Sequence, residues 1–211
     1  IPERTQWVNF VRNLDELNIN KLPKDQQERI YDVFGKNKSS HIYDRGLRRR
    51  VAPMLNNRKK PLELIFALLF GLPGTPLICY GDEIGMGEDL VLPERASVRT
   101  PMQWSADKNA GFSTIASRKT ILPVISFGRY SYKRVNVEQA KKDQKSLYTF
   151  IKNLIQLHKT LPILGNSRPD IWPTSSEHIL AFHYHWKGKK LIALYNLSNK
   201  KQTFDCQLEG L

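Results

Sequence analysis

The 211-residue sequence lacks the features that place a chain in a disulfide-rich or membrane-spanning class. It has two cysteines, Cys79 and Cys206, which are too few and too far apart for a disulfide framework. Both lie in apolar runs, which predicts free buried thiols in a reducing compartment, here the cytoplasm. The longest apolar run, residues 62–74, is too short to span a bilayer and contains Glu63, so it predicts a buried helix and no membrane partner.

Motifs for cofactors and for metal ions are also missing. No glycine spacing of the GxGxxG or GxxxxGK type occurs, and no Ser/His/Asp or Cys/His arrangement follows from spacing. His183 and His185 lie two residues apart and would share one face of a strand. Without further ligands nearby, they favour an exposed strand face over a metal site. We therefore expect neither a cofactor nor a metal ion.

Acidic residues are in short supply, since 33 Lys and Arg residues face 20 Asp and Glu residues, giving a net charge of +13. Such a surplus raises nucleic acid as a partner. Part of it is concentrated in one window: Arg45, Arg48, Arg49, Arg50, Arg58, Lys59 and Lys60. Leu47, Val51, Met54 and Leu55 recur there at helical spacing, which predicts an amphipathic helix with a solvated basic face. Because no aromatic residues are interleaved for base stacking, we do not expect nucleic acid to bind.

The first part of the chain alternates strands with helices. Residues 7–13 and 77–80 read as strands without polar alternation, and residues 23–34 and 61–72 read as helices. This pattern predicts a parallel sheet covered on both faces. A complete (β/α) barrel needs roughly 250 residues, and two strands cannot close one. The chain is therefore expected to be a piece of a larger enzyme, cut at both ends.

The second part of the chain changes character. Residues 85–143 lose their periodicity and are rich in Gly, Pro and polar residues, as functional loops often are. An apolar helical stripe returns over 147–161. Two alternating runs, 179–186 and 190–198, then predict a hairpin, and 202–208 predicts a third strand. The chain is thus expected to be bipartite, with an α/β part followed by a small β part.

Two Asp-Glu pairs are candidates for chemistry. Asp15 directly follows a parallel-type strand, and barrels place their chemistry at the carboxyl ends of strands. The alternative is that Asn13, Asp15 and Glu16 only cap the next segment. Asp82 and Glu83 suggest a glycosidase pair, but neighbouring side chains of a strand point to opposite faces, which favours turn acids at a strand end.

Arg99 lies in the segment VRTPMQW, within the irregular stretch. An arginine followed by proline, glutamine and tryptophan combines a bidentate donor, a rigid bend and an aromatic wall. Such a set can hold sugar hydroxyls near a carboxylate. The alternative is structural, because arginine stems and tryptophan rings also pack against each other.

Six segments in sequence order carry a resemblance to a known family: NFVRNLDEL, RRRVAPML, LLFGLPGTPLICYGDEIGMGEDL, ERASVRTPMQWSADKNAGFS, VNVEQAKKD and ILAFHYHWKGKKLIALYNLSN. Together they resemble the C-terminal half of the trehalose synthases, the maltose α-D-glucosyltransferases of the α-amylase family. The resemblance implies the last strands and helices of a (β/α)8 TIM barrel over residues 1–164, followed by part of an all-β sandwich domain over 165–211. Residues 7–13 and 77–81 would be the seventh and eighth barrel strands, and 147–161 the last barrel helix.

The same resemblance implies roles for individual residues. Asp15 matches the family's third catalytic carboxylate, which binds sugar hydroxyls and stabilises the oxocarbenium-like transition state. Arg99 and Asn13 match substrate-binding positions. The family has a histidine before this aspartate, whereas this chain has Leu14. A lost donor to the transition state costs on the order of a few kcal/mol, or a hundredfold or more in rate.

Nothing in the sequence matches the family's nucleophilic Asp or its acid/base Glu, which come from earlier strands. We therefore expect the chain to be catalytically incomplete alone and to need the N-terminal half of the barrel as its partner. The expected substrate is a small α-glucoside, maltose or trehalose. Three alternatives remain open: an α-glucosidase of the same family, a non-catalytic remnant or sugar-binding subunit, and a basic nucleic-acid binder.

Overall fold

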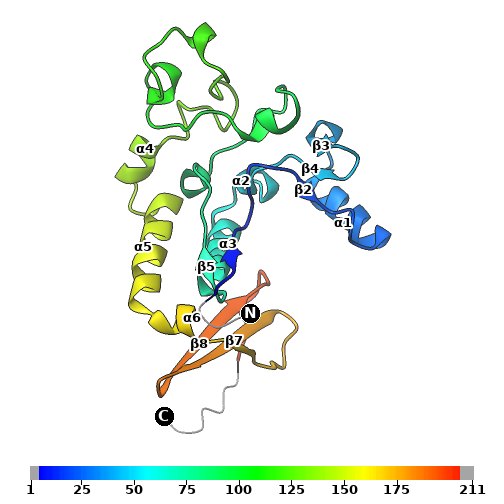
Figure 1. The fold of residues 1–211 in the computed structure, drawn as a ribbon, viewed down its shortest axis with the longest axis vertical. Helices are drawn as coiled ribbons and strands as arrows, with labels where there is room; N and C mark the ends of the chain where they lie inside the picture. Colours follow the sequence, from blue (N-terminus) through cyan, green and yellow to red (C-terminus); the bar gives the residue numbers. More distant parts are fainter. Residues whose placement is uncertain (1–4, 205–211) are drawn as a thin grey trace. The chain divides into compact units, whose positions relative to one another are not determined.

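The computed structural model describes residues 5–204, which form two compact units (Figure 1). Both units are discontinuous in sequence. The first contains residues 5–9, 64–77 and 153–204, and the second contains residues 10–63 and 78–152. Among the helices of this described part, none is long and apolar enough to cross a membrane.

A short parallel ribbon lies in the first unit. Strand β1 (Val8–Asn9) pairs with β5 (Thr75–Pro76), with Val8 opposite Thr75. The backbone N–H of Leu77 also donates to the Asn9 carbonyl at 2.7 Å. The predicted parallel pairing is confirmed, but the predicted strand boundaries were wrong. Only Val8 and Asn9 of the strand predicted at 7–13 are paired, and β5 lies just before the strand predicted at 77–80. The reason is that a strand needs a partner backbone, and within residues 5–204 each of these strands pairs only with the other.

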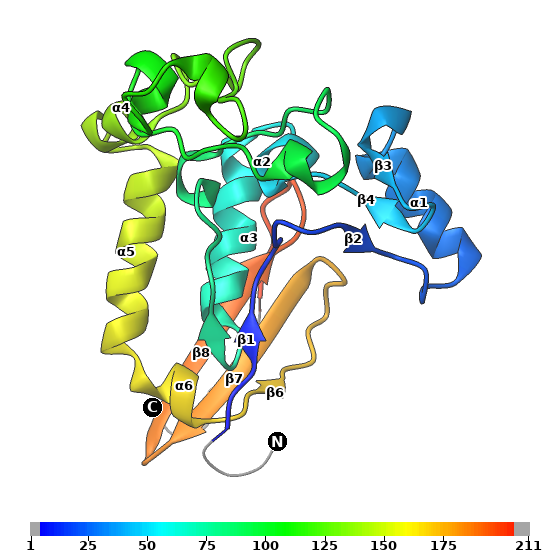
Figure 2. The same ribbon diagram turned by 45° about the horizontal axis from the view of Figure 1, so that its top comes forward.

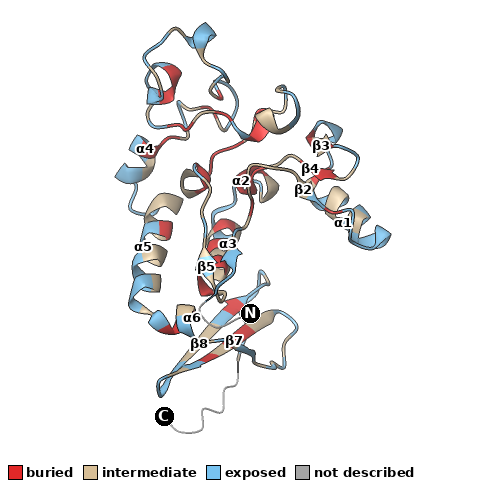
Figure 3. Ribbon diagram, in the orientation of Figure 1, coloured by how far each residue is buried: buried red, intermediate tan, exposed pale blue. Residues whose placement is uncertain are grey.

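The buried helix predicted from the longest apolar run is confirmed. Helix α3 (Lys59–Gly71) has Pro61 in its first turn, where a missing N–H costs nothing. Figure 3 shows buried residues along much of its length, and Phe66 is fully buried. The helix predicted at 147–161 is also confirmed as α5 (Leu147–Thr160). The short helix α6 (Pro162–Asn166) follows it, with Pro162 at its first position.

The first unit ends in a three-stranded antiparallel sheet. Its order is β6 (Asp170–Ile171), β7 (Ile179–Trp186) and β8 (Lys189–Asn196). The predicted hairpin is confirmed, and its two-residue turn has left-handed backbone at both positions, as a type I′ turn requires. The predicted third strand, 202–208, is wrong over 202–204, which form no strand. Its remainder, with Cys206, lies outside the described residues, and the third strand of the sheet is β6 instead.

The core of the first unit joins α6 to the sheet and to the end of α3. Its buried members are Ile163, Leu164, Phe182, Tyr184 and Tyr195. The Tyr184 hydroxyl donates to the carbonyl of Gly71, the last residue of α3. A Cβ atom at Gly71 would lie 1.7 Å from the Tyr195 hydroxyl, so any larger residue here would require the Tyr195 side chain to shift.

The second unit begins with a small sheet and a surface helix, both visible in Figure 2. Strands β2 (Leu17–Asn18), β4 (Gly46–Leu47) and β3 (His41–Ile42) pair antiparallel in that order. Helix α1 (Lys24–Phe34) confirms the helix predicted at 23–34, with Pro23 and Gly35 as its two caps. A 3₁₀ turn, η1 (Lys38–Ser40), leads from this helix into β3.

The basic window does not form the predicted amphipathic helix. The four-residue α2 (Val51–Met54) is helical and Lys59 and Lys60 begin α3, while the arginines before α2 lie just before β4 and in the segment after it. Arg48 donates to the carbonyls of Leu90 and Leu92 at 3.2 and 2.7 Å, and Arg49 donates to Glu88 at 2.6 Å. The predicted solvated basic face is therefore wrong for residues 48–50, because acceptors distant in sequence bind these guanidinium groups, whereas Arg58, Lys59 and Lys60 are exposed.

Residues 85–143 are mostly irregular, as predicted. They contain three 3₁₀ turns, η3 (Glu94–Val98), η4 (Lys108–Gly111) and η5 (Ser117–Lys119), and the short helix α4 (Val137–Lys142). A small core holds the stretch together: Met86, Met102, Ile125 and Val137. The amide of Gln103, fully buried, donates to the carbonyls of Tyr130 and Val135. Packing and loop hydrogen bonds thus replace regular structure here.

Candidate functional site

The segment after β1 is fixed by a buried arginine. Arg12 is buried, and its guanidinium donates to the carbonyls of Arg49 at 3.1 Å and Asp15 at 2.8 Å. The side-chain oxygen of Asn13 accepts the backbone N–H of Asp15 at 3.1 Å, which closes a local Asx turn. This arrangement holds the backbone on both sides of Leu14 and turns the chain so that Asp15 projects outward.

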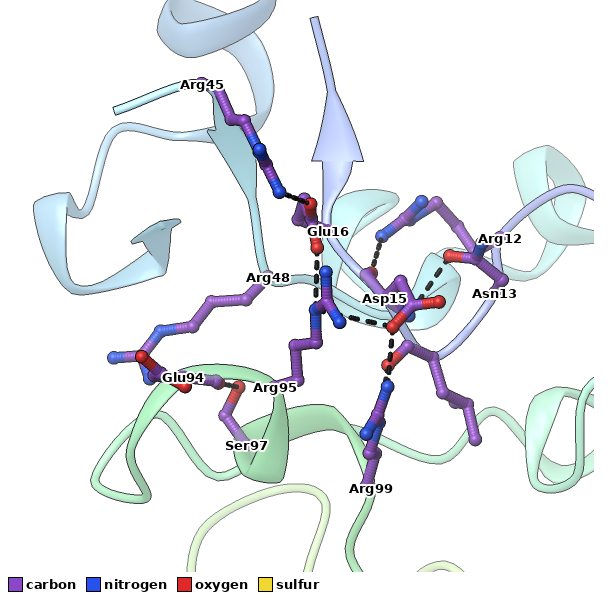
Figure 4. A network of polar contacts seen from close by, with 11 residues as sticks. Arg12, Asn13, Asp15, Glu16, Arg45, Arg48, Glu94, Arg95, Ser97 and Arg99 are labelled. Carbon is purple, nitrogen blue, oxygen red and sulfur yellow. Dashed lines mark hydrogen bonds and ion pairs between the residues drawn. The ribbon is translucent and has the colours of Figure 1, made fainter. Parts of the chain in front are cut away.

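Asp15 meets Arg99, which follows η3 directly (Figure 4). Arg99 Nη2 lies 2.5 Å from Asp15 Oδ1, and Arg99 Nε donates to the Leu14 carbonyl at 2.9 Å. Both side chains are 45% exposed. Two residues singled out separately in the sequence, 84 positions apart, are thus in direct contact. Leu14 contributes its backbone carbonyl to this contact.

A second arginine, Arg95, reaches the same carboxylate. Its Nε lies 3.4 Å from Asp15 Oδ1 and 2.8 Å from Glu16 Oε2. The side chain of Glu16 is only 6% exposed, and it also accepts from Arg45 Nη2 at 2.6 Å. The hydrogen bond from Arg95, followed by one from backbone N–H, lowers the pKa of Glu16 to about 2.

Arg95 was missed in the sequence, because it precedes the segment VRTPMQW that was singled out for Arg99 and stands only in the longer segment ERASVRTPMQWSADKNAGFS that carries the family resemblance. The spacing gives the signal that could have found it. Arg95 lies in the 3₁₀ turn η3, and Arg99 is the residue that ends this turn, four positions later. A second arginine so close in sequence to Arg99 is a candidate for binding the same carboxylate.

A pocket of about 770 Å³ opens beside Arg99 within the second unit. Its lining is mainly apolar and aromatic, and it includes Tyr80, Glu83, Arg99, Trp104, Phe112 and Ile121. The Tyr80 hydroxyl donates to the Thr100 carbonyl at 3.0 Å, which anchors one wall. Asp15 and Arg95 do not line this pocket. Apolar and aromatic walls with a few charged groups are typical of small-molecule sites.

The second Asp-Glu pair lies in a different environment. Asp82 and Glu83 form the 3₁₀ turn η2 (Asp82–Ile84), between left-handed Gly81 and Gly85, which confirms the interpretation as turn acids. Asp82 is 4% exposed and lies 3.6 Å from Arg50 Nη2. Burial raises the pKa of Asp82 to about 6, despite the opposing charge of Arg50. Burial also raises the pKa of Glu83.

The remaining candidates for metal or redox chemistry are isolated. Cys79 is a free thiol whose Sγ lies 3.3 Å from the Arg12 carbonyl, and burial raises its pKa. His183 and His185 contact each other, with their ring nitrogens 3.1 Å apart. Across residues 5–204, no group of three His, Cys, Asp or Glu side chains is placed to hold a metal ion.

Comparisons with known proteins agree with the sequence motifs. The family described as "Alpha amylase, catalytic domain" matches residues 39–167. The chain is 38% identical to trehalose synthase of Thermus thermophilus over 211 residues, covering all of this chain and 22% of that protein. It is also 38% identical to trehalose synthase/amylase TreS of Mycobacterium tuberculosis, covering 99% of this chain and 35% of that protein.

Solved structures agree on the fold. Trehalose-6-phosphate hydrolase of Bacillus licheniformis superimposes with a TM-score of 0.62 at 22% identity, over 96% of this chain and 37% of that chain. The chain therefore spans only about a fifth to a third of the length of the trehalose synthases that it matches. It belongs to the α-amylase family, of whose (β/α)8 catalytic barrel it contains a fragment.

Proposed function

We propose that the chain is the C-terminal segment of a trehalose-synthase-like enzyme that interconverts maltose and trehalose by intramolecular glucosyl transfer. In this role Asp15 binds hydroxyls of the transferred glucosyl unit and stabilises its oxocarbenium-like transition state. Arg99 and Asn13 contribute to substrate binding. The substrate is a small α-glucoside held in the part of the active site that lies next to Asp15.

One observation carries this proposal: the ion pair between Asp15 Oδ1 and Arg99 Nη2 at 2.5 Å. A carboxylate that only capped the following segment would bind local backbone N–H groups. Asp15 instead uses a side-chain oxygen for a charged donor 84 residues away, and both groups keep nearly half of their surface open. A pre-oriented charge is what transition-state stabilisation needs, and the open surface leaves this carboxylate accessible to a substrate.

The chain alone is catalytically incomplete in this proposal. A retaining glycosyl transfer needs a nucleophilic carboxylate and an acid/base carboxyl group on opposite sides of the bond. The segments with family resemblance contain neither. The partner is therefore the N-terminal half of a barrel of the same family. Residues 1–164 form the barrel part, and residues 165–211 form part of an all-β sandwich domain, supported by the antiparallel sheet β6–β7–β8. The proposed compartment is the cytoplasm, supported by the free thiol of Cys79.

The test is product analysis with the natural gene product that contains this sequence. Incubation with maltose is expected to give trehalose with little glucose. Predominant release of glucose would instead identify an α-glucosidase. The 211-residue chain by itself is expected to give neither product. Trehalose formation by that chain alone would contradict its catalytic incompleteness.

A non-catalytic, sugar-binding role is the second candidate, and Leu14 is the observation that favours it. The family's histidine at this position donates to the sugar, whereas leucine has no donor. The Leu14→Ala and Leu14→His variants of the natural gene product separate the two candidates. If the site is catalytic, histidine should raise the rate of glucosyl transfer and alanine should not. If the wild-type protein binds maltose without converting it, and histidine adds no turnover, the sugar-binding role holds.

A further inference from the structure

We propose that Arg95 is a positioning residue for Asp15, held in place by the buried carboxylate of Glu16. This inference rests on the proposed role of Asp15. Arg95 Nε is shared between Glu16 Oε2 at 2.8 Å and Asp15 Oδ1 at 3.4 Å (Figure 4). The guanidinium group thus bridges the two neighbouring carboxylates, one of them buried and the other half-exposed.

Glu16 provides a fixed anchor for Arg95. Its side chain is almost fully buried, and it accepts from two guanidinium groups, Arg95 and Arg45. Both arginines also stack on the ring of Tyr43, at 5.6 and 5.3 Å from its centroid. A guanidinium group bound on its edge and stacked on its face has few rotamers left. Arg95 can therefore impose its own position on Asp15.

Arg45 and Arg95 differ in one respect that matters here. Both bind Glu16 and both contact Tyr43, but of the two only Arg95 also contacts Asp15. If the cluster had only a structural role, substitution of either arginine would be expected to have the same effect. The additional contact with Asp15 assigns the positioning role to Arg95, and it makes Arg45 a matched control.

The two arginines that bind Asp15 also differ from each other. Arg95 and Arg99 both meet Oδ1 of the carboxylate. Arg99 lines the neighbouring pocket, whereas Arg95 and Asp15 do not. Arg95 reaches Asp15 while its Nε is bound to Glu16, so we assign it a role that acts through Asp15. With Oδ1 held by two guanidinium groups, Oδ2 is the oxygen that is presented to a sugar hydroxyl. A half-exposed carboxylate without the second donor would rotate away from this orientation.

The test uses the Arg95→Gln, Arg95→Lys and Arg45→Gln variants of the natural gene product, with kcat and KM for maltose as readouts. Removing Arg95 is expected to lower kcat on the order of tenfold or more, because a misplacement near 1 Å costs up to a hundredfold. KM should change less, since Arg95 acts through Asp15 and not on the substrate itself. Lysine keeps the charge and should restore part of the rate. Arg45→Gln should stay within about twofold of the wild type. Equal losses in Arg45→Gln and Arg95→Gln would overturn the positioning role.

A readout without substrate separates this inference from the proposed function. In crystal structures of the unliganded variants, the Asp15 carboxylate should lose its single orientation in Arg95→Gln and keep it in Arg45→Gln. The orientation should be retained in Arg95→Lys if the charge alone suffices. An unchanged Asp15 in Arg95→Gln would refute the inference even if trehalose is formed. Conversely, a reoriented Asp15 in a protein without glucosyl transfer would support the positioning while refuting the enzymatic role.

Discussion

The molecule contains the dipeptide Asp-Glu twice, at residues 15–16 and 82–83, and the two pairs lie in opposite electrostatic settings. In the first pair, the buried carboxylate of Glu16 accepts from two arginines, and its pKa falls to about 2. In the second pair, Asp82 is buried with one arginine at 3.6 Å, and its pKa rises to about 6. Identical dipeptides thus acquire different charge behaviour from their partners.

The different surroundings of the two Asp-Glu pairs indicate which pair is suited to a functional role. Hydrogen bonds that suit the charged form keep Glu16 ionised, and Asp15 stays half-exposed beside Arg99. Desolvation disfavours the negative charge on Asp82, because this side chain is buried within the second unit. The first pair therefore presents the carboxylate of Asp15 toward the surface. The second pair is part of the buried turn η2.

The largest expected effect is on catalysis. In the natural gene product, Asp15→Asn should lower the rate of trehalose formation from maltose on the order of a thousandfold, equal to about 4 kcal/mol, because it removes a charge that stabilises the transition state. Asp82→Asn is the matched control in the other pair and should lower the rate by less than about tenfold, since Asp82 is buried. Steady-state kinetics measures both variants. A larger loss in Asp82→Asn would reverse the proposed roles.

The next effect is on stability and concerns the arginine partner of each pair. Arg50 is 1% exposed and donates to the Val98 carbonyl at 3.0 Å, besides its ion pair with Asp82. Arg50→Gln should lower the free energy of unfolding by about 3 kcal/mol, because it strands a buried carboxylate and buried acceptors. Arg45→Gln should cost about 1 kcal/mol or less, since Arg45 is partly exposed and Glu16 keeps Arg95.

Urea unfolding curves of both variants at pH 7 measure this difference. Similar midpoints for Arg50→Gln and the wild type would mean that the interior of the second unit tolerates an uncompensated Asp82.

A smaller effect should appear for Glu16 and should depend on pH. The pKa of Glu16 is lowered from 4.5 to about 2, so its stabilising contribution is complete above about pH 4.5 and disappears as the pH falls toward 2. Glu16→Gln should therefore lower the free energy of unfolding by about 2 kcal/mol at pH 7. The gap between variant and wild type should close near pH 2. Thermal unfolding between pH 2 and 7 checks this, and a constant gap would exclude titration of Glu16 as its cause.

The smallest effect concerns Asp82 and has the opposite sign. Its pKa is raised from 3.8 to about 6, so the associated stability is complete below about pH 3.8 and is lost as the pH rises through 6. Between pH 4 and 7, Asp82→Asn should gain about 1 to 2 kcal/mol relative to the wild type. The same unfolding series can measure this slope. A variant that parallels the wild type at every pH would show that Asp82 ionises freely.

The sequence predicted the elements that depend on local patterns. The helix at Lys24–Phe34 follows from Pro23 and Gly35 at its ends, and the hairpin β7–β8 follows from its Lys-Gly turn. Parallel pairing of β1 and β5 was predicted as well, from runs without polar alternation. The predicted cover on both faces is wrong at β1, where Val8 is exposed. The ends of the strands were predicted less accurately, because a strand ends where its neighbouring backbone no longer pairs with it.

The basic window shows why other parts could not be predicted. Arg48 and Arg49 bind acceptors between Glu88 and Glu94, about 40 residues away, and no local pattern identifies these partners. Arg50 is buried for the same reason, with its acceptors at Tyr80 and Val98. Helical spacing of Leu47 and Val51 was therefore a misleading signal. Long-range acceptors, rather than periodicity, determine this segment.

The candidate site was predicted in part. Asp15 and Arg99 were singled out from separate segments, and the structure brings them into contact. Their roles in binding and catalysis stay predictions. Arg95 was not singled out, because its relation to Asp15 depends on the buried carboxylate of Glu16. In the sequence alone, Glu16 looks like one more acidic surface residue.

The parallel ribbon β1–β5 has a practical consequence for anyone who produces this polypeptide. Within residues 5–204, each strand of the ribbon is paired on one side only. Trp7, which precedes β1, is 66% exposed, and Val8, which is part of β1, is 54% exposed. Open strand edges with apolar side chains recruit other strands, including those of identical molecules. Recombinant preparations of the isolated chain should therefore self-associate as their concentration rises, and co-expression with a matching barrel half should keep them dispersed.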